Sequence, residues 1–341
     1  MQACTLNEYS DRTPLMGHIE LTHKCSFKCE FCYNHIKATP ELSTSEVLEI
    51  IDQVVEHGCV YINFSGGEPL LRKDFNDIYF YTKNKGVHVS LESNMYYIPD
   101  GLIELIKEYP ADNFNISIYG LDDKSFQLIT RSKCDFKRVL NNLDALLKGG
   151  VAFKLRTPIS KDVLPILSDL KNYADSLGVS YKADPKIFWR QNGKRLDHLR
   201  ISPEDVIPYV SRHHIYKDLL DSLVKNKLLR GASRCRWGIN EFYINPYGEL
   251  HYCNVYWNSI FDLKKRSFSE IWYGTINRIR KLEGDYCIGK LAAGTGSECP
   301  SGLFYSDSTV NTSLKIGDRL KNMPHICSAL DEDILDIIDG N

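Results

Sequence analysis

Short apolar runs alternate with amphipathic stretches from Gly17 to about Asp184, and this rhythm restricts the chain to very few folds. It is typical of a parallel sheet whose strands are joined by helices. Strands are predicted near residues 17–22, 59–64, 87–92, 113–118, 151–157 and 178–183. Six strand–helix units predict an α/β fold of the partial (β/α)6 barrel type.

The clearest helix is predicted between Ser43 and Gly58. Ser43 followed by Glu46 has the form of a capping box, and Gly58 is placed to end the helix. Apolar residues recur at helical spacing along one face, at Val47, Ile50, Ile51, Val54 and Val55. The stretch is therefore predicted to be an amphipathic helix.

Length and charge limit the remaining possibilities. A chain of 341 residues exceeds a usual single domain, so a barrel with a smaller appendage is the natural division. The net charge of -2 gives no electrostatic argument for nucleic acid or an anionic membrane as a partner. Residues 1–16 lack the features of a secretory signal, and no apolar run is long enough to span a bilayer. We therefore expect a cytoplasmic protein that binds neither nucleic acid nor membrane.

Three of the eleven cysteines form a C-x3-C-x2-C motif at Cys25, Cys29 and Cys32. In a reducing compartment, frequent cysteine indicates metal ligation rather than disulfides. Three thiolates leave one iron of a [4Fe-4S] cluster without a protein ligand, as catalytic metal sites leave a position open. A structural zinc site and a thiol–disulfide motif are the alternatives. However, a zinc ribbon needs a second matching pair, and a redox dithiol needs no third cysteine.

A second motif follows the next predicted strand, in the run Asn63-Phe-Ser-Gly-Gly-Glu-Pro69. Together with the three cysteines it resembles the signature of the radical S-adenosylmethionine enzymes, which have a partial TIM-like barrel. The resemblance implies that the cysteines hold a [4Fe-4S] cluster, that Phe31 packs beside the adenine, and that the Gly-Gly-Glu-Pro run meets the methionine amino group. It implies cofactor contacts at Phe31, Ser65, Gly66, Gly67, Glu68, Pro69, Ser93, Asn94, Ser117 and Arg131.

The proposed roles of the later residues are less closely matched to the family. Ser93 and Asn94 are assigned by resemblance to the ribose hydroxyls, and Ser117 with Arg131 to the ribose or carboxylate, but the run here reads Glu-Ser-Asn-Met where many members have Thr-Asn-Gly. Ser and Asn at strand ends also act simply as turn formers. Each candidate run follows a predicted strand, and barrel enzymes place their sites at the carboxyl ends of strands.

A further motif, C-x12-G-x4-C, joins Cys235 to Cys253 and is followed by Phe268-Ser-Glu-Ile-Trp272. This pattern resembles the SPASM domain of many radical S-adenosylmethionine enzymes. Residues 245–248 read as a hairpin turn between two short strands. The full SPASM cysteine pattern is absent, so the shortened twitch form with one auxiliary [4Fe-4S] cluster is expected.

The auxiliary ligands are assigned by resemblance to Cys235, Cys253, Cys287 and Cys299, with Cys327 as a substitute or as part of a second, incomplete cluster. Cys4, Cys59 and Cys134 have no partner at ligand spacing, and Cys59 and Cys134 are assigned to packing. The expected organisation is an N-terminal extension at 1–16, a barrel at 17–200, a helical linker at 201–233 and a small cysteine-rich SPASM/twitch domain with a β-hairpin at 234–341.

The resemblance implies an enzyme that cleaves S-adenosylmethionine reductively to a 5'-deoxyadenosyl radical and removes a hydrogen atom from its substrate. An auxiliary cluster is a natural electron acceptor, which favours an oxidative change. The expected substrate is a peptide or protein side chain, with a crosslink or thioether as the product in ribosomal peptide maturation. A low-potential flavodoxin or ferredoxin is the expected electron donor.

The barrel begins by residue 17, which leaves no room for the front winged-helix module of many relatives, so a separate peptide-recognition protein is a possible partner. The aromatic and basic run 184–193 is a candidate lining for a peptide cleft, or else a surface loop. A small-molecule dehydrogenase of secondary metabolism and a non-enzymatic electron carrier are the two other function classes. The carrier accounts for the cysteines but not for Gly66 to Pro69.

Overall fold

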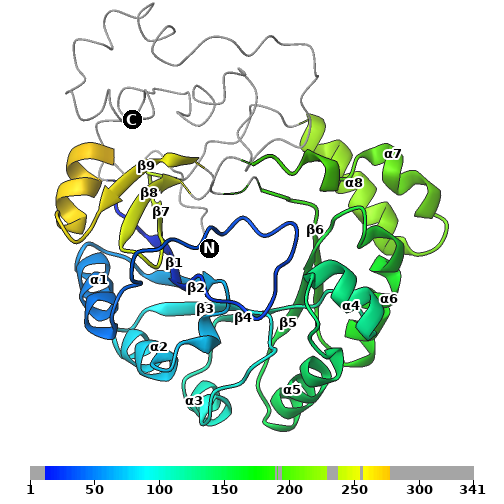
Figure 1. Cartoon of the computed structure of the whole chain (residues 1–341), viewed down its shortest axis with the longest axis horizontal. Coiled ribbons are helices and arrows are strands. Elements are labelled where there is room, and N and C mark those ends of the chain that lie inside the picture. The colour runs from blue at the N-terminus through cyan, green and yellow to red at the C-terminus, as the bar shows by residue number, and fades with distance from the viewer. Residues whose placement is uncertain (1–11, 189, 191–193, 229–236, 254–255, 277–341) are drawn as a thin grey trace, which may run out of the picture.

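The computed structural model describes residues 12–188, 190, 194–228, 237–253 and 256–276. Its centre is a nine-stranded sheet with the order β6-β5-β4-β3-β2-β1-β7-β8-β9. The sheet curls so that its helices lie around the outside, as Figure 1 shows for α1, α2, α3, α5 and α6. The α/β barrel architecture expected from the sequence is confirmed.

The six predicted strands are all present and pair in parallel. They are β1 (Met16–Thr22), β2 (Tyr61–Gly66), β3 (His88–Ser93), β4 (Asn113–Ser117), β5 (Lys154–Pro158) and β6 (Tyr181–Asp184). Strands β5 and β6 each begin three residues later than predicted. Val151 at the start of the apolar run of β5 is buried, but its N–H donates to Leu146 O at the end of the preceding helix rather than to a strand.

The helices between the strands carry their apolar faces toward the sheet. They are α1 (Thr44–Glu56), α2 (Phe75–Asn84), α3 (Leu102–Glu108), α4 (Asp123–Thr130), α5 (Phe136–Lys148) and α6 (Leu167–Ser176), with short 3-10 turns η1 (Pro69–Leu71) and η2 (Leu164–Ile166). The capping box of Ser43 and Glu46 is formed, and Gly58 has φ +94° just after α1. The prediction for this helix is confirmed.

A helical stretch connects β6 to the last strands. It contains η3 (Asp197–Leu199), α7 (Pro203–Val206), η4 (Ile207–Tyr209) and α8 (His214–Leu228). The run that includes Trp272 is helical as well, in η5 (Glu270–Ile276). The sequence predicted helical structure for the linker that begins at residue 201.

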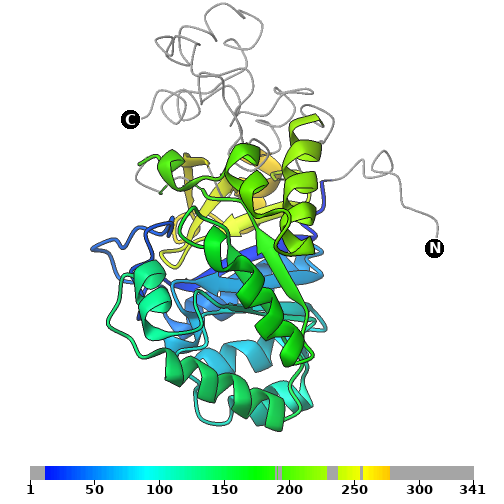
Figure 2. The same ribbon diagram turned by 90° about the vertical axis from the view of Figure 1, so that its right-hand side faces the viewer.

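The strands beyond residue 233 extend the barrel sheet. Strand β7 (Glu241–Ile244) pairs in parallel with β1, and β8 (Glu249–Cys253) and β9 (Tyr256–Asp262) continue antiparallel from it. Figure 2 shows these yellow strands next to the blue β1. The hairpin predicted at residues 245–248 is confirmed, with Gly248 at φ +81° and its N–H bonded to Asn245 O. The boundaries of the four expected segments stay a prediction.

The two faces of the sheet differ sharply in polarity. Residues that point toward the helices are apolar and buried, for example Ile19, Phe64, Leu91, Ile116 and Leu155. Residues at the alternate positions are polar on every strand from β1 to β6, including His18, Asn63, Ser90, Glu92, Asn115 and Arg156. Because side chains alternate along a strand, these polar groups face the interior of the curved sheet.

None of the helices in the described part of the chain has the length and apolar character that a membrane crossing requires.

Candidate cofactor site

The site lies where β1, β2 and β3 end, as the sequence predicted. The loop between β1 and α1 carries Cys25, Cys29 and Cys32, and we call residues 23–42 the cysteine loop. Its first residues are stacked on the loop that follows β2. The N–H of Gly67 donates to Thr22 O at 2.7 Å, and the N–H of Glu68 donates to Lys24 O at 2.8 Å.

Gly66 and Gly67 are required by this stacking. A Cβ on Gly66 would lie 2.2 Å from Thr22 O, and Gly66 has φ +135°. A Cβ on Gly67 would lie 2.4 Å from Lys24 O. Glycine permits a close approach of one backbone to another, and here the approaching backbone is that of Thr22 and the start of the cysteine loop.

Glu68 is fully buried beneath this junction and accepts three hydrogen bonds. The donors are Ser93 Oγ at 2.8 Å, Asn94 N at 2.6 Å and Leu70 N at 3.2 Å. Burial raises the pKa of Glu68 to about 7, although the hydrogen bonds favour the charged form. In the described ranges no lysine or arginine forms an ion pair with this carboxylate. A cationic group of a ligand would therefore meet a buried acceptor already held in place.

Asn94 connects this carboxylate to the cysteines. Its Nδ2 lies 3.4 Å from Cys25 Sγ, and the N–H of Phe27 lies at the same distance from that sulfur. Burial raises the pKa of Cys29 well above its ordinary value, and the negative charges of Cys32 and Cys25 add to this effect. Iron would relieve that repulsion because metal coordination holds thiols in the deprotonated form.

These features fit the cluster and cofactor that the motifs imply. Cys25, Cys29 and Cys32 share one loop. Asn94 contacts both Cys25 and the buried carboxylate of Glu68, which has no cationic partner among the described residues. No three His, Cys, Asp or Glu side chains among the described residues converge on a single metal ion. In a four-iron cluster each thiolate binds a different iron.

The other predicted cofactor residues lie around this centre. Pro69 begins η1 directly after Glu68, and Ser65 faces the interior beside Glu20 in the register of β2 and β1. Ser117 ends β4 opposite Arg156. The hydroxyl of Ser93 donates to Glu68 and accepts from Met95 N. Its contact with the ribose stays a prediction, and these bonds do not support it.

Arg131 contacts the middle of the cysteine loop, and Phe31 lies within it. Arg131 adopts a left-handed backbone conformation at the end of α4, with φ 50°, and pairs with Glu30 at 2.7 Å. The ring of Phe31 lies 5.6 Å from that of Tyr119. Phe31 also packs against the small buried cluster of Ile187, Leu196 and Leu199.

The segment after β6 covers the same loop. Arg190 Nη2 donates to Glu30 O at 3.1 Å, and the Phe188 ring meets Tyr33 edge-on at 6.2 Å. His198 Nε2 lies 3.1 Å from Glu30 Oε1. The aromatic and basic run suggested as a cleft lining therefore packs beside the cysteines in its described part.

The barrel interior contains a charged group that the motif search missed. Arg156 Nη1 donates to both oxygens of Glu92 at 2.9 Å, and its Nη2 lies 3.3 Å from Asp184 Oδ2. Asn115 Nδ2 donates to Glu92 Oε1 at 3.0 Å. All three charged side chains are partly exposed, at 19% to 26%. The polar residues at every second position of β3 to β6 were the available signal.

Both cysteines that were assigned to packing lie at the hydrophobic core. Cys59 is buried in the core, and Cys134 packs against the core with its Sγ 3.6 Å from Ser26 O. Cys253 ends β8. The remaining cysteines, Cys4, Cys235, Cys287, Cys299 and Cys327, lie outside the described residues.

Comparison with known proteins gives one family model. Residues 19–163 match the model of the Radical SAM superfamily. Among curated proteins, a probable GTP 3',8-cyclase of Methanocella arvoryzae is 34% identical over 136 residues, which are 39% of this chain and 43% of that protein. PqqA peptide cyclase of Granulibacter bethesdensis is 25% identical over 171 residues, 49% of this chain and 46% of that one.

The chain spans about half the length of the curated relatives it matches. Among solved structures, Streptococcus suis SuiB bound to the precursor peptide SuiA superposes with a TM-score of 0.66 at 14% identity. The superposition covers 88% of this chain and 76% of SuiB. At that identity the likeness concerns the fold.

Proposed function

We propose that the protein is a radical SAM enzyme that cleaves S-adenosylmethionine to oxidise a peptide, on the premise that residues 19–163 match the Radical SAM superfamily model. The observation that carries the proposal is the buried carboxylate of Glu68, fixed by Ser93 and Asn94 beside Cys25. It offers a methionine ammonium group a charged acceptor next to three thiols. A plain iron–sulfur carrier has no use for such an acceptor.

We assign the cofactors to the residues as follows. Cys25, Cys29 and Cys32 hold a [4Fe-4S] cluster, and Glu68 accepts the ammonium group of S-adenosylmethionine. When bound, the cluster and S-adenosylmethionine supply one-electron and radical chemistry that no protein side chain provides. The chain's own part is to place the cofactor, with Asn94 near Cys25 and the stacked Gly66–Gly67 backbone fixing Glu68.

A peptide substrate is supported by two relatives. SuiB, which shares the fold, has been solved with its precursor peptide SuiA, and PqqA peptide cyclase carries its substrate in its name. We propose a net two-electron oxidation such as a crosslink or thioether, with an auxiliary cluster as electron acceptor. Its proposed ligands are Cys235, Cys253, Cys287 and Cys299, with Cys327 as substitute.

The cellular setting follows from the same chemistry. A flavodoxin or ferredoxin of low potential would supply the electron, and a separate protein would present the peptide. We place the enzyme in the cytoplasm because thiolate-held clusters suit a reducing compartment.

A small-molecule substrate is the second candidate. The relative with 34% identity is named for a nucleotide substrate, and the barrel interior carries the polar group of Glu92, Arg156 and Asp184. A polar small molecule would suit such an interior as well as a peptide side chain does.

Two experiments test the proposal. Anaerobic co-expression with peptides encoded beside the gene should yield a product lighter by two hydrogens in mass spectrometry, whereas a product of unchanged mass would contradict the oxidation. Iron per chain should fall from about eight to about four when Cys25, Cys29 and Cys32 are all changed to alanine, since each cubane holds four irons. If reduced, iron-loaded protein forms no 5'-deoxyadenosine from S-adenosylmethionine, the proposed enzymatic activity is refuted.

A further inference from the structure

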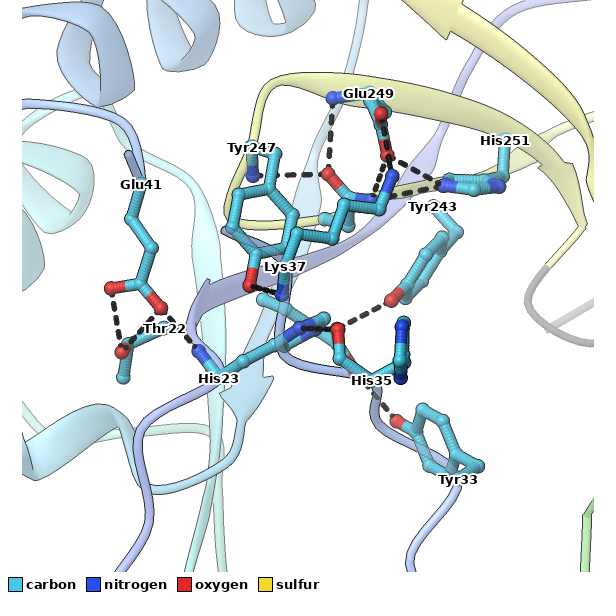
Figure 3. A network of polar contacts seen from close by, with 12 residues as sticks. Thr22, His23, Tyr33, His35, Lys37, Glu41, Tyr243, Tyr247, Glu249 and His251 are labelled. Carbon is cyan, nitrogen blue, oxygen red and sulfur yellow. Dashed lines mark hydrogen bonds and ion pairs between the residues drawn. The ribbon is translucent and has the colours of Figure 1, made fainter. Parts of the chain in front are cut away.

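A second buried carboxylate, Glu20, lies in β1 on the interior side and is only 1% exposed. Its Oε2 lies 2.6 Å from His23 Nε2, and its Oε1 accepts from Tyr33 Oη at 2.9 Å. The hydroxyl of Tyr243 donates to Oε2 as well. Figure 3 shows the rings of His23, Tyr33 and Tyr243 converging on one point between the cysteine loop and the hairpin.

Two of the three donors come from the cysteine loop and the third from β7. His23 is two residues before Cys25, Tyr33 directly follows Cys32, and Tyr243 lies in β7. We call Glu20, His23, Tyr33 and Tyr243 the loop clamp. Its carboxylate therefore connects the start and the end of the cysteine motif to a strand more than two hundred residues later.

A second set of contacts runs along the rim of the same junction. Lys37 Nζ lies 2.5 Å and 2.7 Å from the two oxygens of Glu249, and the N–H of Lys37 donates to Tyr247 Oη at 2.8 Å. The N–H of Leu42 donates to Pro246 O at 2.7 Å. These contacts hold the far part of the cysteine loop against the β7–β8 turn.

The inner contacts outweigh the rim contacts. The Lys37–Glu249 pair is partly exposed, and pairs of this kind contribute at most about 1 kcal/mol. The side chains of Glu20 and His23 are fully buried, and a buried charge that loses a partner is far more costly than an exposed one. The loop clamp is therefore the part of the junction that decides where the cysteine loop lies.

We propose that Glu20 is the positioning residue of the cysteine loop and that, through Tyr243, it makes the placement of Cys25 and Cys32 depend on β7. This inference rests on the proposed function in one respect, because it is the proposed function that assigns Cys25, Cys29 and Cys32 to a cluster. Removal of Tyr243 Oη should loosen both ends of the motif.

The test compares thiol alkylation rates in the full-length, iron-free chain, resolved for each cysteine by mass spectrometry. In Tyr243→Phe and in Glu20→Gln, the buried Cys29 and the half-buried Cys32 should react roughly tenfold faster, the change produced by losing about 1.4 kcal/mol. Buried Cys59 reports opening of the whole core in the same sample, and its rate should not change. Tyr79→Phe is the matched control, because Tyr79 is fully buried and its hydroxyl donates to Tyr109 O at 2.7 Å, on the helix side of the sheet.

A second measurement uses the iron-loaded enzyme. The reduction potential of its cluster should shift in Tyr243→Phe but not in Tyr79→Phe, since hydrogen bonding and solvent access around a cluster set its potential. The proposal is overturned by wild-type rates at Cys29 and Cys32 in both clamp variants, or by equal acceleration at Cys59. A chain that binds no iron would refute the proposed function, yet the alkylation result would still decide the clamp.

Discussion

At the scale of single residues, Glu68 stands out because its carboxylate has three hydrogen-bond donors and no cationic partner among the described residues. A buried carboxylate that is held in this way is prepared for a ligand cation, at the cost of a pKa raised to about 7. In the proposed site, Ser93 and Asn94 would act on the ligand through this carboxylate as well as directly.

The first prediction concerns this acceptor. Glu68→Gln should weaken binding of S-adenosylmethionine by roughly ten- to hundredfold, because a hydrogen bond to a charged group contributes about 1.5–3 kcal/mol. Titration of the iron-loaded protein, followed by the spectroscopic response of its cluster, measures the affinity. Glu104→Gln removes an exposed carboxylate from α3 and should leave the affinity unchanged. Equal affinities in the two variants would argue against the assigned role of Glu68.

His18 gives a second prediction, about pH. Burial lowers the pKa of His18 to about 4, although nearby Glu20 acts in the opposite direction. The unfolded chain therefore binds a proton near pH 6.5 that the folded chain refuses, so stability falls as the pH drops from about 6.5 toward 4. His18→Gln should remove about 3 kcal/mol of this acid sensitivity. Urea unfolding at a series of pH values checks it, and identical pH slopes for variant and wild type would contradict it.

The residues that sequence alone identified are those in local motifs. Cys25, Glu68 and Asn94 were predicted because their neighbours in the chain mark them. Glu92 and Arg156 were not, because their partners are brought to them by the register of parallel strands. Glu20 was not, because one of its partners, Tyr243, lies on a strand more than two hundred residues later. The role of a polar residue at an interior strand position cannot be predicted until its neighbours across the sheet are known.

At the scale of elements, the stacking of the cysteine loop on the β2–η1 connection depends on two glycines. Gly66→Ala should destabilise the fold far more than Gly86→Ala. Both positions have positive φ, 135° and 76°, but a Cβ on Gly86 meets nothing within 4 Å, whereas on Gly66 it meets the Thr22 carbonyl.

The expected costs differ in kind. Gly86→Ala should cost about 1–2 kcal/mol for the left-handed backbone alone. Gly66→Ala adds displacement of the cysteine loop and should also lower iron content. Thermal unfolding and iron analysis of the two variants check this third prediction, which would be wrong if they proved equally stable.

The elements themselves were largely predictable. Alternating apolar runs gave all six barrel strands, and a capping box located α1. The hairpin at 245–248 was also predicted from its turn residues. What local patterns could not supply was the partner of β7, because a short apolar strand carries no information on which edge it joins. Its parallel pairing with Met16–Ile19 is a long-range result of packing.

At the scale of the whole molecule, an aromatic group holds β7 to the barrel. The ring of Phe242 lies 5.0 Å from that of Phe268 and 6.0 Å from that of Trp272, and it packs over Gly17 of β1. Any side chain on Gly17 would collide with this ring, since a Cβ there would lie 2.5 Å from Phe242 Cζ. The seam between the two parts of the sheet is therefore a packed core.

The fourth prediction tests that seam. Phe242→Ala should destabilise the chain by about 3–5 kcal/mol, as expected for a fully buried phenylalanine. Phe80→Ala, at a position that is 41% exposed, should cost much less. Urea unfolding gives both values. A small loss for Phe242→Ala would mean that β7 contributes little to the stability of the barrel.

The pairing of β1 with β7 also has a consequence for how the chain is made. During synthesis β1 leaves the ribosome before the strand that covers its outer edge, which emerges only after the five strands β2 to β6 and α8 have followed. Until then that edge presents unpaired backbone groups to any extended segment nearby. A nascent chain of this protein is thus exposed to mispairing between the synthesis of β1 and that of β7, and chaperones that shield strand edges would be of most use to it in that interval.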